Sequence, residues 1–302
     1  MTHPAVVVVG SCNVDLVARC ASLPAPGETV LARSFVSVVG GKGANQAIAA
    51  ARAGARCAIV GAVGDDAGAE TIRAALVTAG VDVSSLRSVA GPSGTALIFV
   101  DDAGQNCIVV VPGANATLET LGDADRSLVA AADAVLFQLE VPLAIVSTAA
   151  SAARGLRVLN AAPARPLPSD VLQSIDLVVV NEREAETLAP GSTTREDGGG
   201  LLDLVPRVAV TLGADGARYA DRDGVRLTVA APRANVVDTT GAGDTFAAVL
   251  VTALAERRTT RQALELACAA ASLSVEIAGA SSSIPNRDAI EARWSTEYGG
   301  AR

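Results

Sequence analysis

The chain has 302 residues, half of them apolar and only 2% aromatic, with a net charge of -8. Binding to nucleic acid without regard to sequence needs a basic surface, which such an acidic chain lacks. We therefore expect a small-molecule ligand and no nucleic-acid partner. No apolar run reaches the roughly 18 residues that cross a bilayer, and the opening MTHPAVVVVG has no basic signal-peptide start. We therefore expect a cytoplasmic protein with no membrane partner.

The chain is poor in several residue types that carry enzyme chemistry. His3 is the only histidine, and the five cysteines are scattered without a CxxC pair. A Ser-His-Asp triad, a histidine-based metal site and a disulfide framework are therefore disfavoured, and carboxylates are left to transfer protons. Lys42 is the only lysine among 24 basic residues. Either composition favours arginine, or the slim ammonium fits between the glycines of GGKGAN where a guanidinium does not.

Apolar runs alternate with helical patterns along most of the chain, which predicts βαβ units and a doubly wound, mostly parallel α/β sheet flanked by helices. The scarcity of aromatic residues suits strands buried on both faces by small aliphatic side chains. The predicted strands are Ala5–Val9, Cys57–Val60, Ala134–Phe137, Arg157–Leu159, Leu177–Val180 and Arg207–Thr211, and the predicted helices are Gly43–Ala53, Ala67–Ala79, Gly241–Glu256 and Thr260–Ile277.

Two β-rich stretches, Glu28–Val38 and Thr95–Val111, break this alternation. Because consecutive strands without a crossover helix cannot pair in parallel, we predict antiparallel strands that leave the main sheet. Together they form a small β-sheet lid, built from discontinuous segments at about 16–38 and 92–112 of a single domain over 1–302. The apolar face of such a lid predicts a homodimer formed through it. Ala189–Gly200 reads as a low-complexity loop.

The segment VVDTTGAGDTFAA at 236–248 carries the strongest chemical signal. An extended stretch ends at Asp238 and a glycine-rich turn opens a helix, so the amides of Gly241, Ala242 and Gly243 form an anion hole. Asp244 in the first turn is then placed as general base for a hydroxyl that attacks the bound phosphate. A helix cap, with Asp244 complementing the helix dipole, is the purely structural alternative.

Two other glycine patterns do not match nucleotide-binding motifs. Lys42 is followed by Gly43 rather than Ser or Thr, so GGKG is not a P-loop. Phe246 stands where a dinucleotide fingerprint needs a third Gly or Ala, which disfavours an oxidoreductase. Asn181 and Glu184, three residues apart after an apolar strand, satisfy a helix capping box and can also face a site.

Five segments in the same order along the chain resemble those of the ribokinase family, also called phosphofructokinase-B-type carbohydrate kinases. The pair GGKGAN and DTTGAGDTF is highly specific, and the resemblance covers nearly the whole chain. It implies transfer of phosphate from MgATP to D-ribose, giving ribose 5-phosphate. The segments are VVGGKGANQAIAAARAGA at 38–55, LNAAPAR at 159–165, NERE at 181–184, TLGADG at 211–216 and VDTTGAGDTF at 237–246.

The resemblance also implies roles for individual residues on the sugar side. Asp15 can accept two hydrogen bonds from a vicinal diol, and Glu140 closes the pocket. All of these residues follow strand C-termini, where open α/β sheets bind ligands. The implied sugar-binding residues are Asn13, Asp15, Gly41, Lys42, Gly43, Asn45, Glu140 and Asp244.

On the nucleotide side, the resemblance assigns the Asn181 and Glu184 spacing to magnesium and phosphate positioning. The implied ATP-binding residues are Asn181, Glu184, Thr211, Leu212, Gly213, Ala214, Asp215, Gly216, Gly243 and Cys268.

A monovalent cation, expected to be potassium, is the third implied cofactor beside ATP and Mg²⁺. The loop GASSSIP at 279–285 is rich in carbonyl and hydroxyl oxygens and follows the last predicted helix. In the family the matching loops enclose the ion, which implies ligands from Asp238, Thr240, Ser274, Ile277, Gly279 and Ser283. An ordinary loop with Asp238 as a helix cap is the alternative.

Other readings of the whole chain stay open at this point. Deoxyribose, fructose, a ketodeoxy acid or a nucleoside could replace ribose within the same fold, although a nucleoside base would want more aromatic surface than this chain has. A non-catalytic sugar sensor would lack the base or the glycine anion hole, and both are present.

Overall fold

A computed structural model describes residues 3–190 and 200–299, and within them the dominant element is a nine-stranded sheet. Its strand order is β13-β12-β11-β10-β9-β8-β1-β4-β5, with parallel pairing from β5 to β11 and antiparallel pairing between β11, β12 and β13. The strands are β1 Ala5–Val9, β4 Arg56–Val63, β5 Leu86–Ser88, β8 Ala134–Phe137, β9 Leu156–Asn160, β10 Leu177–Asn181, β11 Arg207–Thr211, β12 Ala217–Asp221 and β13 Arg226–Val229.

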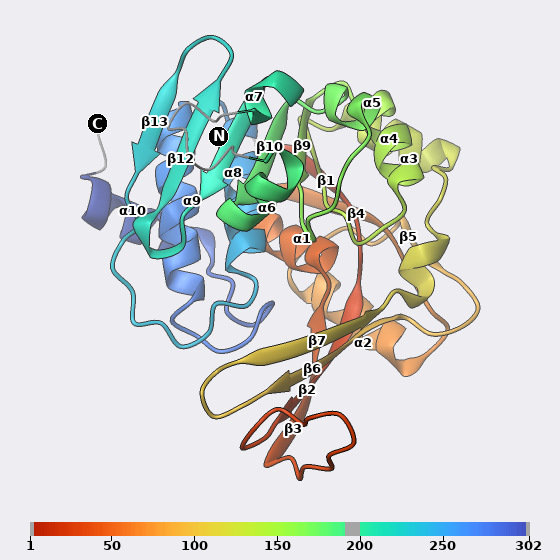
Figure 1. The fold of residues 1–302 in the computed structure, drawn as a ribbon. Helices are drawn as coiled ribbons and strands as arrows, with labels where there is room; N and C mark the ends of the chain where they lie inside the picture. Colours follow the sequence, from red (N-terminus) through yellow and green to blue (C-terminus); the bar gives the residue numbers. More distant parts are fainter. Residues whose placement is uncertain (1–2, 191–199, 300–302) are drawn as a thin grey trace.

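Helices cover both faces of this sheet (Figure 1). Successive strand residues point to opposite sides, so Val6 and Val8 of β1 join one core cluster, whereas Val7 and Val9 join the other. The first cluster packs against α1 Lys42–Arg52, α2 Ala67–Thr78, α8 Ala242–Ala255, α9 Thr260–Ser274 and α10 Arg287–Tyr298. The second packs against α3 Asp123–Ala131, α4 Leu143–Ala152, α5 Ser169–Gln173, α6 Glu182–Leu188 and α7 Leu201–Leu204.

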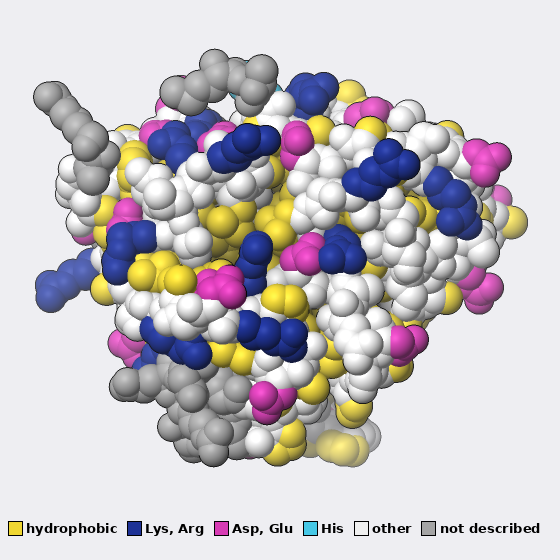
Figure 2. Space-filling model, turned by 90° about the horizontal axis from the view of Figure 1, so that it is seen from above, with side chains coloured by type: hydrophobic (Ala, Val, Ile, Leu, Met, Phe, Trp, Pro, Cys, Tyr) yellow, Lys and Arg dark blue, Asp and Glu magenta, His cyan; other side chains and the backbone are white. Residues whose placement is uncertain are grey.

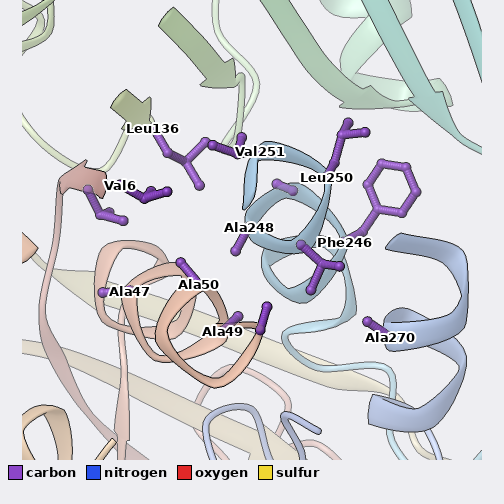
Figure 3. Packing of buried hydrophobic residues seen from close by; sticks show 14 of the residues in the cluster. Val6, Ala47, Ala49, Ala50, Leu136, Phe246, Ala248, Leu250, Val251 and Ala270 are labelled. Atoms are coloured by element: carbon purple, nitrogen blue, oxygen red, sulfur yellow. The ribbon is translucent and has the colours of Figure 1, made fainter. Parts of the chain in front are cut away.

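Alanine side chains form much of the contact between α1 and α8. Ala49 and Ala50 of α1 are fully buried near Ala248 of α8, whereas Ala47 lies on the far side of α1 (Figure 3). Small side chains let two helix backbones approach closely, so polar residues at the start of each helix can meet directly. This contact brings the GGKGAN and DTTGAGDTF motifs together.

A second sheet of four strands projects from the main body below α1 and α2 (Figure 1). Its order is β3-β2-β6-β7, formed by β2 Asn13–Arg19, β3 Ser34–Gly40, β6 Gly94–Val100 and β7 Asn106–Val111. The outer pairs are antiparallel, and the central pair β2–β6 is parallel. We call this the small sheet.

The prediction of a doubly wound, mostly parallel α/β fold with a separate small sheet is confirmed. The details of the small sheet differ from the prediction in two ways. Glu28–Arg33 forms no strand, and β2 and β6 pair in parallel rather than antiparallel. The parallel pair is possible because the connection between these strands is long and contains α1, β4 and α2.

Three elements at the C-terminal side were not predicted. The hairpin of β12 and β13 extends the main sheet, and α10 follows the GASSSIP loop. Only Ile290 and Trp294 of α10 are buried, so its apolar periodicity is too weak to detect. Most of the predicted loop 189–200 lies outside the described residues.

Candidate active site

The predicted site residues gather at one edge of the main sheet because parallel strands end there together. Ser11 follows β1, Glu140 follows β8, and Asn160 and Asn181 end β9 and β10. The small sheet extends from this edge through β2, which begins at Asn13. Segments far apart in sequence therefore share one site, at the position where open α/β sheets bind ligands.

Asp244 lies at the centre of this site, in the first turn of α8, and its side chain is buried. Asn45 Nδ2 donates to its Oδ2 at 3.1 Å, and Gln46 Nε2 donates to its Oδ1 at 2.9 Å. Burial raises the pKa of Asp244, while the Lys42 ammonium and the two amides act to lower it. In turn Asp244 raises the pKa of Lys42, which stays cationic. A desolvated carboxylate held by two amides suits general-base work.

Asp15 on β2 and Glu140 after β8 form a second acidic part of the site. Burial, followed by repulsion from Glu140 and Asp244, raises the pKa of Asp15 to about 7. Within the described residues, Asp15 Oδ1 and Asn45 Oδ1 are buried without a hydrogen-bond partner. Buried acceptors without partners are costly, so this pair is suited to a ligand that brings hydroxyl donors.

The loop after β1 and the start of α1 hold Glu140 in place. Ser11 Oγ donates to Glu140 Oε2 at 2.6 Å, and the Lys42 backbone amide donates to the same oxygen at 3.0 Å. Gly40 is required beside this network, since a Cβ there would lie 2.0 Å from Asp15 Oδ2. Gly40 therefore lets the backbone approach Asp15, and Gly41 and Gly43 let it approach the main chain of the loop after β1.

Asn13 is held by Asn115 of the segment after β7. Asn115 Nδ2 donates to Asn13 Oδ1 at 2.8 Å and its Oδ1 accepts from the Cys12 amide at 2.9 Å. A Cβ on Gly94 would lie 2.2 Å from Asn13 Oδ1, so this cluster is tightly packed. Asn13 therefore has its side-chain oxygen occupied before any ligand binds.

The glycine turn at the start of α8 has the geometry of an anion site. Gly241 has a positive φ of 77°, which glycine adopts without strain, and a Cβ on Gly243 would meet no heavy atom within 4 Å. The Ala242 amide, however, donates to Thr239 O at 3.3 Å. Of the three predicted donors, that of Ala242 is thus already engaged, and Gly243 offers open space for a ligand.

Asp238 ties this turn to the loop after α9. Its Oδ1 accepts from the Thr240 amide at 2.9 Å and the Thr240 hydroxyl at 2.6 Å, and its Oδ2 accepts from the Gly279 amide at 2.9 Å. Burial alone would raise the pKa of Asp238, but these hydrogen bonds lower it overall. Three other predicted cation ligands lie within five residues of Gly279 in the sequence. Of these, Ser274 and Ser283 are buried and Ile277 is exposed.

The predicted nucleotide residues fall into two groups. Residues 213–215 are an exposed turn after β11, and Asn181 and Glu184 form the predicted capping box of α6, with Asn181 Oδ1 accepting from the Glu184 amide at 2.9 Å. Burial raises the pKa of Glu184, and Lys42 and Asp244 lie within its electrostatic range. Cys268, by contrast, is buried in α9, and this burial raises the pKa of its thiol to about 12.

Four buried side chains of the site were missed as functional candidates: Ser11, Gln46, Asn115 and Asn160. Gln46 and Asn160 stand inside the motifs GGKGANQA and LNAAPAR, which offered a signal for them. Ser11 and Asn115 had no sequence signal, because their partners are remote in the chain.

Charged groups also cluster away from the site, where Arg258 and Arg287 each pair with both Glu256 and Glu291, so these carboxylates are neutralised by cations. Within the described segments, no three His, Cys, Asp or Glu side chains are grouped so that they could hold a metal ion, and no helix could cross a membrane. On the face seen in Figure 2, Lys and Arg side chains are interspersed with Asp and Glu rather than gathered in one area.

Comparison with known proteins agrees with this geometry. The sequence profile described as pfkB family carbohydrate kinase matches residues 3–287. The chain belongs to this family. The ribokinase of Bacillus subtilis is 41% identical over 293 residues, covering 95% of this chain and 98% of that protein. The ribokinase of Haemophilus influenzae is 38% identical over 291 residues, covering 93% and 95%.

Solved structures extend the likeness to three dimensions. Arabidopsis thaliana ribokinase complexed with ribose and ATP matches with a TM-score of 0.91 and 35% identity, covering 97% of this chain and 99% of that one. Thermotoga maritima ribokinase matches with a TM-score of 0.89 and 33% identity, covering 96% and 99%. This kinase therefore shares its fold with ribokinases over nearly its full length.

The raised pKa of Asp15 predicts a pH-dependent stability for the ligand-free kinase. The folded state keeps a proton that the unfolded state releases, so this group makes the free energy of unfolding fall as the pH rises from the ordinary value of 3.8 through about 7, above which its effect levels off. Asp15→Asn should therefore be more stable than the wild type at pH 8, by about 1 to 4 kcal/mol, and show little difference at pH 4.5. Denaturant unfolding at both pH values measures this; an equal difference at both would contradict it.

Proposed function

We propose that this protein is a ribokinase, transferring the γ-phosphoryl group of ATP to a hydroxyl of D-ribose to give ribose 5-phosphate and ADP. The observation that carries the proposal is Asp244, a buried carboxylate held by two amides beside the open glycine turn of α8. The names of the ribokinase relatives, and the ribose and ATP of the Arabidopsis complex, support the choice of substrates.

In the proposed reaction, Asp244 takes the proton from the ribose hydroxyl as its oxygen attacks the γ-phosphorus. The bond from that phosphorus to the bridging oxygen breaks in line, and ADP leaves with this oxygen. Lys42 and the free amides at Gly241 and Gly243 stabilise the charge on the transferred group. Asp15, Asn45 and Glu140 hold the sugar through its other hydroxyls.

Mg²⁺ fits the acidic side chain of α6. One oxygen of Glu184 accepts from the Asn181 amide, and burial raises the pKa of Glu184 although this hydrogen bond and the Lys42 ammonium act to lower it, so a further cation would stabilise its charged form. Mg²⁺ in kinases needs only one or two protein carboxylates, because phosphates and waters complete its shell. When bound with ATP it would neutralise phosphate charge, and Asn181 and Glu184 would orient it.

The identity of the sugar rests on the relatives more than on the fold. The Methanocaldococcus jannaschii nucleoside kinase has the same fold with a TM-score of 0.84 but only 20% identity, so the fold alone does not choose between substrates. Measuring ATP-dependent phosphorylation over a panel of ribose, deoxyribose, fructose, a ketodeoxy acid and inosine tests the choice. We expect the highest kcat/KM for ribose.

Substitution of the proposed base tests the mechanism directly. Asp244→Asn keeps the shape of the side chain and removes its ability to accept a proton, so kcat should fall by roughly 10² to 10⁴. ATP binding should be largely unchanged, because Asp244 acts on the hydroxyl. Steady-state kinetics with ribose and calorimetric titration with ATP check both; near-normal turnover would remove Asp244 from this role.

A monovalent cation fits the oxygen-rich loops around Asp238. The ligands would be the Asp238 carboxylate, carbonyls at Thr240, Ser274, Ile277 and Gly279, and Ser283. The Asp238 carboxylate already joins the Thr240 turn to the Gly279 loop by hydrogen bonds, so a cation there would stiffen the backbone that leads to Gly243.

Potassium should therefore activate turnover. We expect kcat to rise several-fold when KCl replaces choline chloride at constant ionic strength, with a smaller change in KM. The variant Asp238→Ala should lose this response, which separates a specific site from a general salt effect. Equal rates with and without potassium would contradict the proposed cation site.

The small sheet is proposed to act as a lid that excludes water and as the interface of a homodimer. Its strands expose apolar side chains, including Phe35 at 63% and Ile108 at 50%. A second copy of the same sheet would cover such a surface through a two-fold contact.

Light scattering at micromolar concentration tests the dimer. The wild type should have twice the mass of one chain, and Ile108→Glu with Val110→Glu should give monomers, because charged side chains resist burial without partners. Val77→Glu, on the exposed side of α2, is the matched control and should stay dimeric. A monomeric wild type would refute the dimer and leave the lid untouched.

A further inference from the structure

Gln46 is a buried polar side chain that contacts the proposed base directly. It lies on α1 with 0% exposure, and its Nε2 donates both to Asp244 Oδ1 at 2.9 Å and to Asn160 Oδ1 at 3.1 Å. Asn160 ends β9, and its own Nδ2 donates to Val179 O of β10 at 3.2 Å. A chain of hydrogen bonds thus links a main-chain carbonyl of the central sheet to the base.

The direction of this chain is fixed by its two ends. Val179 O can only accept, so the Nδ2 of Asn160 must face it and the Oδ1 of Asn160 must face Gln46. The ionised carboxylate of Asp244 can also only accept, so the same Nε2 of Gln46 must face both partners. If the Gln46 amide were flipped, its Oε1 would face two other acceptor oxygens, those of Asn160 and Asp244, and no hydrogen bond would form.

While the Nε2 of Gln46 donates to these two acceptors, its side-chain oxygen is left without a hydrogen bond. Its Oε1 is buried and has no hydrogen-bond partner in the described part of the chain. A glutamine kept only for packing would be replaced at little cost by an apolar side chain, because an unpaired buried oxygen is unfavourable. The contact of Nε2 with Asp244 is therefore the feature that this residue supplies.

We propose that Gln46, anchored by Asn160, is a positioning residue that orients Asp244 and keeps it ionised until it accepts the proton of the ribose hydroxyl. The proposal rests on the proposed function of Asp244 as general base. Asn45 engages the other oxygen, so each oxygen of the base has an amide donor. Gln46 differs from Asn45 in being fixed to the sheet by a second contact.

Charged groups from four other segments also act on Asp244. Lys42 on α1 favours its ionised form, whereas Glu140 after β8, Asp15 on β2 and Glu184 on α6 disfavour it. Burial works in the same direction as these carboxylates. The hydrogen bond from Gln46 opposes them, since a donor to a carboxylate stabilises the charged form. Its loss should therefore raise the pKa of the base.

The test is the pH dependence of the single-turnover rate of phosphoryl transfer at saturating ribose and ATP. Gln46→Met keeps the length of the side chain and removes its donor. We expect the acidic limb of the profile to move to higher pH by about 1 unit, so that the rate below the limb falls about tenfold. Asn160→Ala, which removes the anchor, should shift the limb in the same direction by less.

Gln138→Met is the matched control. Among the residues that the structure describes, Gln138 is equally buried, donates to Val9 O alone and also has an unpaired Oε1. It should leave the limb in place, whatever it does to stability. A limb in Gln46→Met that coincides with the wild type overturns the proposal, even if the plateau falls. If Gln46→Met does not fold, an unshifted limb in Asn160→Ala overturns it.

The two levels of inference fail in different ways. If the wild type does not phosphorylate any sugar, or if Asp244→Asn keeps normal turnover, the proposed function or the base assignment is wrong. If the wild type is active, Asp244→Asn is not, and Gln46→Met has an unshifted limb, only the positioning role is wrong.

Discussion

The contact between α1 and α8 is the interaction on which the site depends. Asn45 and Asp244 are 199 positions apart in the sequence, yet their side chains bond at 3.1 Å. Alanines along the helix interface make this possible, because larger side chains would hold the backbones apart (Figure 3). This alanine-lined interface therefore sets the distance between the GGKGAN motif and Asp244.

Carboxylates that repel one another are concentrated around this contact between α1 and α8. Asp15, Glu140, Glu184 and Asp244 act on one another across a site that contains Lys42, the only lysine of the chain. Burying several carboxylates together destabilises the folded protein, and the raised pKa values of Asp15 and Asp244 express that cost. Hydroxyl donors and cations would stabilise the buried carboxylates, so a ligand that brings them would stabilise the folded protein when it binds.

Hydrogen bonds to the main chain fix the side chains that do the chemistry. Glu140 is held by the Lys42 amide, Asp238 by the amides of Thr240 and Gly279, and Asn160 by Val179 O. Each contact ties a site residue to a rigid element or a glycine turn. The site thus keeps its geometry without ligands, which lowers the reorganisation needed during phosphoryl transfer.

The sequence by itself predicted every strand of the parallel part of the sheet except β5, and it placed a glycine turn followed by Asp244 at the start of α8, because periodicity and capping are local properties of the chain. Motif resemblance added Asp15, Lys42 and Glu140. Only the tertiary structure decided that Gln46 and Asn160 join Asp244, that Ser11 holds Glu140, and that β2 and β6 pair in parallel. These contacts join segments separated by whole helices and strands, so their geometry exists only after the two helices and the sheet have packed.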